Sequence, residues 1–168
     1  MAKAEAKRVD GGDQAAHVAR GLRESALWIF GALALILFAS LVSYDRADPA
    51  FSSTGQPGPV TNLIGPFGAW LSDLFFVLFG LPAYLFPIML GIAGYHLFQE
   101  RGSRDPVDRR SASFRGLEFF LALASSCGLA TLHFSGDGFP NTAGGVVGSL
   151  LGEGLAGSMS FLGATLLL

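Results

Sequence analysis

The side chains that could carry chemistry are few and lie far apart along this sequence. The histidines are His17, His96 and His133, and their spacing matches no metal-ligand pattern. The single cysteine, Cys127, lies inside an apolar run, where a small packed residue is the ordinary interpretation. Both lysines lie within the first ten residues, so the lysine of a phosphate-binding loop is missing from the remainder of the chain. We therefore expect no catalytic residue, no metal site and no cofactor in these residues.

Acidic side chains beside the apolar runs are the remaining candidates, because charge close to a membrane is often functional. Asp73, Glu118 and Glu153 each lie near the end of such a run. We interpret them as interfacial or capping carboxylates. A proton or ion relay is an alternative, but the three positions do not line up across a membrane. An outer metal site is a second alternative, and it would combine Asp73 and Glu153 with His133 and Asp137.

Three long apolar stretches without charge dominate the sequence, at 25–44, 74–98 and 119–134. The chain is 51% apolar and only 14% of its residues are charged, against about 25% in a soluble domain. About 20 apolar residues span the hydrocarbon core as a helix, and backbone groups in lipid must be paired internally. The predicted fold class is therefore all-α, a polytopic membrane protein with four transmembrane helices. Their approximate ranges are 25–44, 71–98, 114–134 and 155–168.

The distribution of basic residues predicts the topology. Ten of the 11 basic side chains lie in two groups, five before the first apolar run and five between 99 and 115. Only Arg46 lies between the first two runs, and none follows Arg115. Lysine and arginine are retained on the cytoplasmic side of a bacterial membrane. We therefore expect both termini and the charged turn at 99–113 in the cytoplasm, and the loops after 44 and after 134 outside.

The sequence divides into a tail and one membrane domain. Residues 1–24 are rich in alanine and charged residues, and we expect a mostly disordered cytoplasmic tail. Residues 25–168 form the membrane domain. Within it, the apolar stretch 60–70 contains glycine and proline and is predicted to lie in the outer interface as a short helix or re-entrant piece. The second helix is longer than the bilayer core, so a kink is expected at Pro82 and Pro87.

Small residues recur at four-residue steps near the end of the chain. Gly144, Gly148 and Gly152 lie on nearly one face of a helix, and small residues let a partner helix approach closely. We predict close helix packing there; the alternative is that a Gly-rich segment produces this spacing by chance. The helix that follows, 155–168, is only about 21 Å long. We expect this fourth helix to be truncated, and the sequence to be a piece of a longer protein.

A weak internal repeat links the two Gly-rich stretches. The first copy comprises Asn62, Gly65, Gly68 and Asp73, and the second comprises Asn141, Gly145, Gly148 and Glu153. The register between the copies needs one inserted residue. Each copy follows a predicted inside-to-outside helix and precedes an outside-to-inside helix. We therefore predict two helix hairpins, each with a Gly-rich outer element.

Four motifs are recognisable along the sequence, and the last of them consists of two segments. Segment 41–52 fits L-x-S-Y-x-x-x-D-P-[SA]-[WF]-S, segment 62–73 fits N-x-x-G-x-x-G-A-x-L-[SA]-D, and segment 79–87 fits F-G-x-x-A-Y-L-x-P. Segments 140–148 and 163–168 complete the set on the approach to the fourth helix. The motif positions are Asp48, Pro49, Asn62, Gly65, Gly68, Asp73, Gly80 and Pro87. In this order, and over roughly 24–168, the sequence resembles the N-terminal membrane domain of FtsK-type DNA translocases, the FtsK/SpoIIIE family.

The resemblance implies a function. Members of this family carry a four-helix membrane domain, a long linker and a hexameric ATPase motor that pumps double-stranded DNA through the closing division septum. These residues would then be the membrane anchor and division-site interaction domain of an ATP-dependent DNA translocase that links chromosome segregation to cell division. The implied location is the bacterial inner membrane at the septum. The implied partners are the lipid bilayer and other division proteins, with self-association through the motor of the parent protein.

The motor lies outside these residues, so we expect them to have no enzyme activity and no direct nucleic-acid binding. ATP and magnesium would be bound only by the missing motor. The main alternative is a small four-helix channel or transporter, but its polar-lined path is hard to find because the charges lie at helix ends. A third possibility, an intramembrane enzyme, is disfavoured by the missing catalytic cluster.

Overall fold

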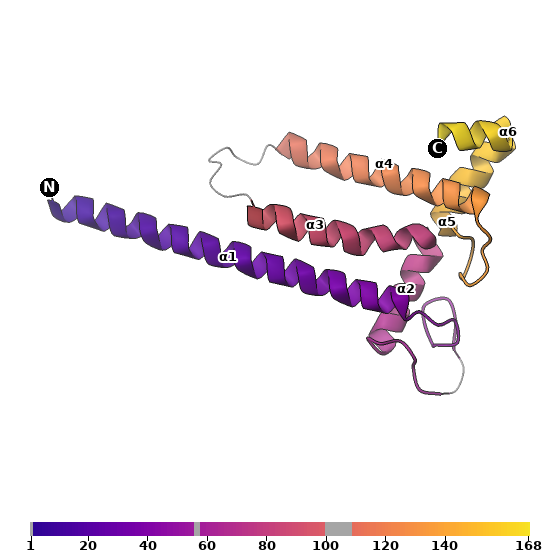
Figure 1. Ribbon diagram of the computed structural model, residues 1–168, viewed down its shortest axis with the longest axis horizontal. Helices are drawn as coiled ribbons and strands as arrows, with labels where there is room; N and C mark the ends of the chain where they lie inside the picture. The colour runs from indigo at the N-terminus through magenta and orange to yellow at the C-terminus, as the bar shows by residue number, and fades with distance from the viewer. Residues whose placement is uncertain (1, 56–57, 100–108) are drawn as a thin grey trace.

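Three long helices run alongside one another and set the length of the molecule (Figure 1). The computed structural model describes residues 2–55, 58–99 and 109–168, and every regular element in them is helical. The long helices are α1 (Ala2–Val42), α3 (Leu85–Gln99) and α4 (Arg109–His133). The connections that follow α1 and α4 lie at one end of this bundle, which we call the loop end (Figure 1). The predicted all-α class is confirmed for the described residues.

Helix α1 is longer than the sequence predicts. We expected a disordered tail over 1–24 and a helix over 25–44, whereas one continuous helix runs from Ala2 to Val42. Alanine has the highest helix propensity and recurs through the first half of this helix, which favours extension of the apolar span beyond its predicted start. In the structure the segment 2–24 is helical and continuous with the apolar span, so no helix boundary lies at 24.

The predicted second helix, 71–98, is divided into separate elements. They are α2 (Pro66–Phe79), a 3-10 turn η1 (Leu81–Tyr84) and α3. The break lies at Gly80, whose φ of 60° is a left-handed conformation that favours glycine. Pro82 lies in η1, and Pro87 lies in the first turn of α3, where a proline costs no helical hydrogen bond. The expected kink in one helix is thus a complete break, and it comes before both prolines.

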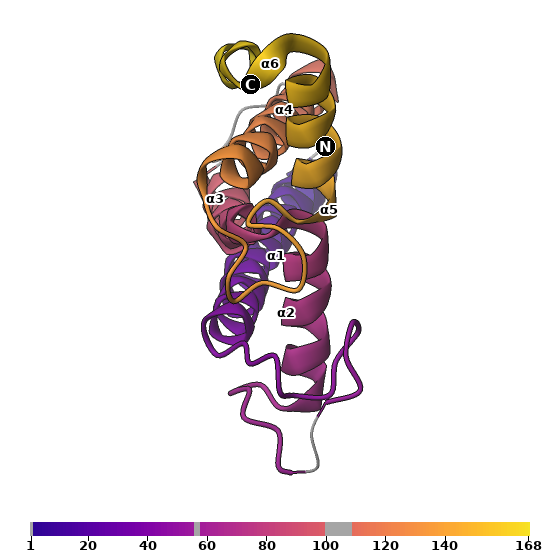
Figure 2. The same cartoon turned by 90° about the vertical axis from the view of Figure 1, so that its right-hand side faces the viewer.

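Two shorter segments cross the loop end of the bundle (Figure 2). The first is α2. The second is a continuous run made of α5 (Gly145–Gly148), the π-helical turn η2 (Ser149–Glu153) and the first part of α6 (Gly154–Leu167). Gly65 immediately precedes α2 and Gly145 starts α5, and both glycines have positive φ, 76° and 65°. The short element predicted over 60–70 corresponds to the entry into α2.

The last segment turns back along α4. Inside α6, Ser160 has a φ of 71° and a ψ of 163°, and the helix changes direction there. Beyond this turn the ring of Phe161 lies 5.3 Å from the ring of His133, and the side chain of Leu168 covers Gly128. The first contact is with the end of α4 and the second is with an earlier residue of α4. The end of α6 therefore runs antiparallel to α4 (Figure 1).

The predicted fourth helix, 155–168, therefore differs from expectation in two respects. Its helical run starts at Gly145, and Ser160 interrupts it. The backbone conformation of Ser160 is one that residues other than glycine rarely adopt. A sequence pattern therefore gives no signal for a turn at this serine.

Among the described residues, three helical stretches are long and apolar enough to cross a membrane, judged by length and composition. They are Glu24–Val42 in α1, Gly116–His133 in α4 and Gly145–Leu167 through α5, η2 and α6, the last of which changes direction at Ser160. Helix α3 is not one of them because the break at Gly80 leaves it only 15 residues. The structure thus supports a membrane protein with several spans, while the count of four stays a prediction.

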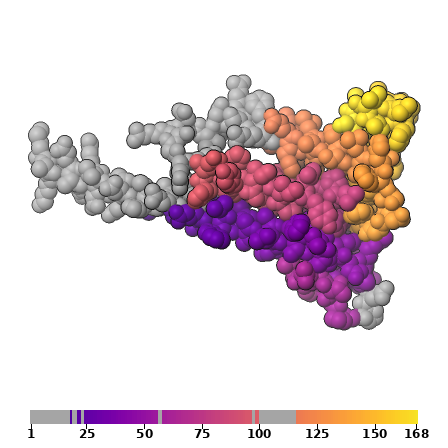
Figure 3. All heavy atoms as spheres, in the orientation of Figure 1, coloured from indigo at the N-terminus to yellow at the C-terminus, as the bar shows by residue number. Residues whose placement is uncertain are grey.

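The core lies where α1, α2 and η1 meet. Its buried members are Leu37, Leu41, Phe76 and Ala83. The ring of Phe76 lies 4.9 Å from the ring of Tyr44 and 5.3 Å from the ring of Phe139, so it joins the two loops at the loop end. Farther along the bundle α1 and α3 pack side by side, with Gly94 against Phe30 (Figure 3). This core fixes the position of α2 relative to the long helices.

Candidate functional site

Asp73 lies at the centre of a hydrogen-bond network that closes the loop between α1 and α2. Its side chain is only 1% exposed. One carboxylate oxygen accepts hydrogen bonds from the hydroxyls of Tyr44 and Ser52, each at 2.9 Å. The other oxygen accepts the backbone N–H of Ser52. This carboxylate therefore fastens the loop both to α2 and to the end of α1.

Asp48 makes a second connection of the same kind. Its side chain is 3% exposed, and its two oxygens accept the backbone N–H groups of Thr61 at 2.8 Å and Asn62 at 3.0 Å. The Thr61 hydroxyl also donates to this carboxylate, at 3.1 Å. We call Asp48 and Asp73, with these partners, the carboxylate latch. In the part of the chain that the structure describes, every buried side-chain polar atom has a hydrogen-bond partner, so the latch is a satisfied network of the kind that rigidifies a fold.

Asn62 joins the latch to α1. Its buried amide nitrogen donates to the carbonyl oxygens of Ser40 at 2.9 Å and Ser43 at 3.3 Å. Ser40 lies in the last turn of α1, whose carbonyls lack partners within the helix, and Ser43 directly follows the helix. Its amide oxygen accepts the backbone N–H of Ile64 at 3.1 Å. A Cβ on Gly68 would overlap that amide oxygen, so only glycine fits beside this cap.

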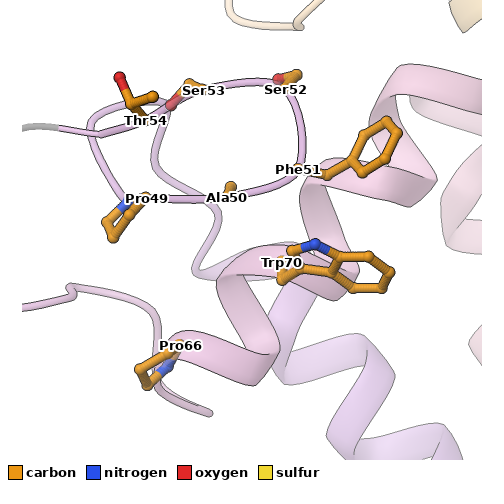
Figure 4. Close-up of a pocket in the computed structure, with 8 residues that line it drawn as sticks. All are labelled: Pro49, Ala50, Phe51, Ser52, Ser53, Thr54, Pro66 and Trp70. Carbon is orange, nitrogen blue, oxygen red and sulfur yellow. The ribbon is translucent and has the colours of Figure 1, made fainter.

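The latched loop and the start of α2 enclose an open groove of about 550 Å³ (Figure 4). Phe51 and Trp70 form its aromatic side, with ring centroids 5.9 Å apart, and Pro49 and Pro66 lie on the other side (Figure 4). Gly55, with a φ of 72°, brings the loop back onto Pro49. All of the residues that line the groove are uncharged. The groove can therefore offer aromatic and aliphatic contacts and a few hydroxyls, but no ionic recognition.

Glycines let the two halves of the chain cross in close contact. At the end of α2 the backbone N–H of Leu81 donates to the carbonyl oxygen of Ala143 at 2.7 Å. A Cβ on Gly80 would overlap that same oxygen, and a Cβ on Gly145 would lie 2.5 Å from the carbonyl carbon of Leu78. Both glycines have positive φ. The crossing therefore needs glycine at both positions, for conformation and for space.

The predicted small-residue face lies against α4. A Cβ on Gly144 or Gly148 would overlap the carbonyl oxygen of Cys127, and a Cβ on Gly152 would lie 2.8 Å from the carbonyl oxygen of Gly128. Such backbone contact leaves no room for a larger residue. We call the contacts made by Gly80, Gly144, Gly145, Gly148 and Gly152 the glycine crossing.

The other candidate side chains from the sequence are not brought together. His96 lies near the end of α3, whereas His133 ends α4 at the loop end. Glu118, Glu153 and Asp137 are exposed. Among the described residues no three histidine, cysteine, aspartate or glutamate side chains are placed to hold a metal ion together. Residues 100–108 of the predicted turn at 99–113 lie outside the described residues.

Some residues of the latch have roles that the sequence pattern does not indicate. Asp73 is a buried acceptor of the latch, whereas we had interpreted it as an interfacial or capping carboxylate. The motif at 41–52 contains Tyr44 and Ser52, the two hydrogen-bond partners of Asp73, so the sequence pattern marks both positions. Their common partner was not visible, because Asp73 lies 29 residues from Tyr44 and 21 from Ser52 along the chain.

The carboxylate latch holds the loop in place and does not provide an acid–base pair for proton transfer. Burial, followed by the hydrogen bond to Asp73, raises the pKa of the Tyr44 hydroxyl well above its ordinary value of 10.0. The hydroxyl is therefore a fixed donor at neutral pH. Such a donor beside a carboxylate acceptor can hold a loop in place, and its proton is not available for transfer near pH 7.

An all-helical fold with several apolar spans and a latched loop at one end defines a polytopic membrane domain. A protein-family model described as the 4TM region of DNA translocase FtsK/SpoIIIE matches residues 19–168. The chain belongs to this family, and the resemblance predicted from the motifs is confirmed.

Relatives named DNA translocase FtsK match most of the chain. The protein from Pseudomonas syringae pv. tomato is 36% identical over 148 residues, which cover 87% of this chain and 18% of that relative. The protein from Vibrio parahaemolyticus is 37% identical over 142 residues, covering 84% of this chain and 14% of the relative. The Pseudomonas aeruginosa protein is 38% identical over 150 residues, with shares of 86% and 18%. The chain thus spans less than a fifth of the length of these relatives. No solved structure matches it.

Proposed function

We propose that this chain is the membrane anchor and division-site interaction domain of an FtsK-like, ATP-dependent DNA translocase. The observation that carries the proposal is the family match over 19–168, which includes all three apolar spans. Translocation itself would belong to the motor of the parent protein. These residues would hold that motor in the bacterial inner membrane at the division septum, with the bilayer and other division proteins as their partners.

The proposed orientation puts both termini in the cytoplasm and the loop end outside. Basic side chains support it, because five precede the first apolar span and five lie between 99 and 115, while Arg46 alone belongs to the loop end. Such residues are retained on the cytoplasmic side. The starts of α1 and α4 and the end of α3 lie away from the loop end (Figure 1), in agreement with this orientation.

Four spans are supported by the internal repeat. Gly145 lies 80 residues after Gly65, Ser160 lies 80 residues after Gly80, and all four have positive φ. In the first half, the chain crosses the loop end, breaks at Gly80 and returns alongside α1 as α3. In the second half it crosses the loop end, turns at Ser160 and starts back along α4. We infer that the segment after Ser160 is the start of a helix equivalent to α3, which would complete a second hairpin.

Reporter fusions test this orientation. An alkaline phosphatase moiety is active only outside the cytoplasm, so fusions after Gly55 and Gly138 should be active and a fusion after Ser103 should be inactive. A cytoplasmic result at Gly55 would overturn the orientation. The fusion at Ser103 is the matched control for expression level, because it interrupts the same chain on the opposite side.

A channel or transporter gains no support from the hollow between η1, α3 and α4. This hollow of about 350 Å³ is lined by apolar side chains apart from Tyr84 and Ser126. The Tyr84 hydroxyl donates to the carbonyl oxygen of Leu41, and the Ser126 hydroxyl donates to that of Ala122. Within the described residues the hollow therefore lacks free hydroxyl donors that could line a polar path.

A fluorescent protein fused after Leu168 tests the proposed role directly. We expect membrane fluorescence concentrated at the division septum. The matched control is the same reporter on an unrelated four-helix membrane protein, which should label the membrane evenly. Even labelling by the present chain would contradict the division-site role, and signal in the soluble fraction would contradict the anchor.

Purified in detergent, the chain should show no DNA-stimulated ATP hydrolysis. The reason is that no lysine follows Lys7, so these residues cannot supply a phosphate-binding loop of the usual kind. ATP and magnesium would then be cofactors of the motor alone. Turnover above that of a mock preparation would contradict this part of the proposal.

A further inference from the structure

We propose that the loop after α1 and the helix α2 form a lipid-immersed cap, which lies in the headgroup–acyl boundary of the outer leaflet. The inference rests on the proposed function, which puts the loop end at the outer face of the membrane. The partner of the loop end is then lipid. The side chains in contact with lipid are Phe51, Leu63, Phe67 and Trp70.

From Asp48 to Asp73 the polarity of this region is inverted relative to a loop in water. Two of the three carboxylates in the loop and α2 are buried, Asp73 at 1% and Asp48 at 3% exposure, and both are satisfied by groups of the same loop. The third carboxylate, Asp45, lies exposed beside Arg46 shortly after the end of α1. Its large apolar side chains point outward, with Leu63 75% exposed and Phe67 64% exposed. Soluble surfaces rarely expose apolar side chains in contiguous patches. Polar groups inside and apolar groups outside are what a lipid environment favours.

The sequence between the two buried carboxylates has the same character. No charged residue lies between Asp48 and Asp73. Phe67 and Trp70 lie one turn apart on α2, on the side opposite the buried residues Ser72 and Phe76. Aromatic side chains of this kind concentrate at the interface between lipid and water.

The position of α2 matches the plane of a membrane surface. α1 and α4 contain candidate spans and lie on either side of α3, and α2 crosses the loop end of this bundle (Figures 1 and 2). If α1 and α4 cross the bilayer, a helix that crosses their outer end lies along its surface. The exposed face of α2 then meets lipid headgroups and the upper part of the acyl chains.

The second crossing segment repeats the arrangement. Leu150 lies 80 residues after Trp70, the same interval that relates Gly145 to Gly65. Its side chain is 71% exposed, and that of Trp70 is 44% exposed. Both crossing segments therefore present a large apolar side chain at the same position of the repeat. A common lipid surface accounts for this in both halves, whereas a protein partner for one loop would not.

The experiment uses tryptophan fluorescence of the chain in nanodiscs. The chain has two tryptophans, so Trp28→Phe leaves Trp70 as the only reporter, and Trp70→Phe leaves Trp28. The nanodiscs contain phosphatidylcholine that is brominated either near the headgroup end or near the methyl end of the acyl chain. Bromine quenches a nearby indole. We expect Trp70 to be quenched severalfold more by bromine near the headgroup end than by bromine near the methyl end.

Two controls define the scale. Asp137→Trp, in a background without the native tryptophans, puts the indole at an exposed, charged position of the other loop and should respond mainly to aqueous acrylamide. Phe67→Cys, with Cys127→Ala, gives a readout without tryptophan. Its thiol should react with a water-soluble maleimide only after detergent is added, whereas Asp137→Cys should react at once.

The two tryptophans test the lipid-immersed cap and the membrane anchor separately. Quenching of Trp28 by brominated lipid reports insertion of α1, independently of Trp70. Quenching of both tryptophans supports the cap. Quenching of Trp28 with acrylamide-accessible Trp70 would overturn the cap, leave the anchor intact and point to a surface for water or a protein partner. Shielding of Trp70 from both quenchers would also overturn the cap, because it would mean contact between copies of the chain.

Discussion

The backbone N–H of Leu81 donates a hydrogen bond to the carbonyl oxygen of Ala143 at 2.7 Å. This bond joins the turn after α2 to the loop that precedes α5, and a Cβ on Gly80 would overlap its acceptor oxygen. The Cys127 thiol, on α4, lies 3.5 Å from the carbonyl oxygen of Phe79 beside the same crossing. The two halves of the chain therefore meet backbone to backbone at one point, and glycines supply the space.

The glycine crossing should be far less tolerant of bulk than the surface next to it. Gly148→Leu would push a side chain into the Cys127 carbonyl and Thr131 hydroxyl, and we expect it to lower the free energy of unfolding by about 3 kcal/mol. Leu150→Ala removes an exposed side chain two residues away and should change it by no more than about 0.5 kcal/mol. Thermal unfolding in detergent measures both. An equal or reversed order would mean that the four-residue spacing is incidental.

Removal of the Asp73 carboxylate should release the loop. Asp73→Ala leaves the Tyr44 hydroxyl and the Ser52 N–H without their acceptor, which should cost about 2 kcal/mol. Tyr44→Phe removes one donor only and should cost about 1 kcal/mol. Asp137→Ala, at an exposed aspartate of the other loop, is the control.

Loop release is best measured by labelling. A Ser53→Cys reporter on this loop should react with a water-soluble maleimide several times faster in the Asp73→Ala background than in the parent. Equal labelling rates in both backgrounds, with equal melting temperatures, would show that the carboxylate is not what holds the loop.

Alkaline pH should weaken the latch through Tyr44. Burial and the hydrogen bond to Asp73 raise the folded-state pKa of this hydroxyl above its ordinary value of 10.0. The folded state therefore holds the proton more tightly than the unfolded state, so stability is intact below about pH 10 and falls as pH rises above it. Melting temperatures of the parent should decline more steeply between about pH 10 and pH 11 than those of Tyr44→Phe. Parallel declines would show that Tyr44 ionises equally in both states.

Composition was sufficient to predict the apolar spans in α1 and α4, because lipid imposes a strong requirement for length and hydrophobicity. It was not sufficient for the stretch 71–98. A run of apolar residues cannot distinguish one long helix from a crossing helix, a break and a return. The break at Gly80 depends on its contact with Ala143, which lies far along the chain. Helix boundaries that are set by tertiary contact have no local signal.

The latch was predictable only in part. Asp48, Asn62 and Asp73 were singled out as motif positions, yet nothing local distinguishes a buried acceptor from an interfacial carboxylate. Their roles arise when the loop folds back and brings Ser52 and Tyr44 to Asp73. The internal repeat, by contrast, could be predicted from the spacing of residues in the sequence. The structure shows the role of its glycines, because Gly65 and Gly145 both have a left-handed φ at the entry to a crossing segment.

The turn at Ser160 and the break at Gly80 predict opposite responses to substitution. Ser160 has a φ of 71° and a ψ of 163°, a region that is almost restricted to glycine, so Ser160→Gly should relieve strain and stabilise the fold by about 1 kcal/mol. Gly80→Ala adds a Cβ at a φ of 60° that would overlap the Ala143 carbonyl oxygen, and it should destabilise by more than about 2 kcal/mol. Thermal unfolding in detergent compares the two, with Gly154→Ala as the control at a helical glycine whose added Cβ meets nothing. If Ser160→Gly destabilised the chain, the serine side chain itself would be needed at the turn, and the equivalence of Ser160 with Gly80 would have to be abandoned.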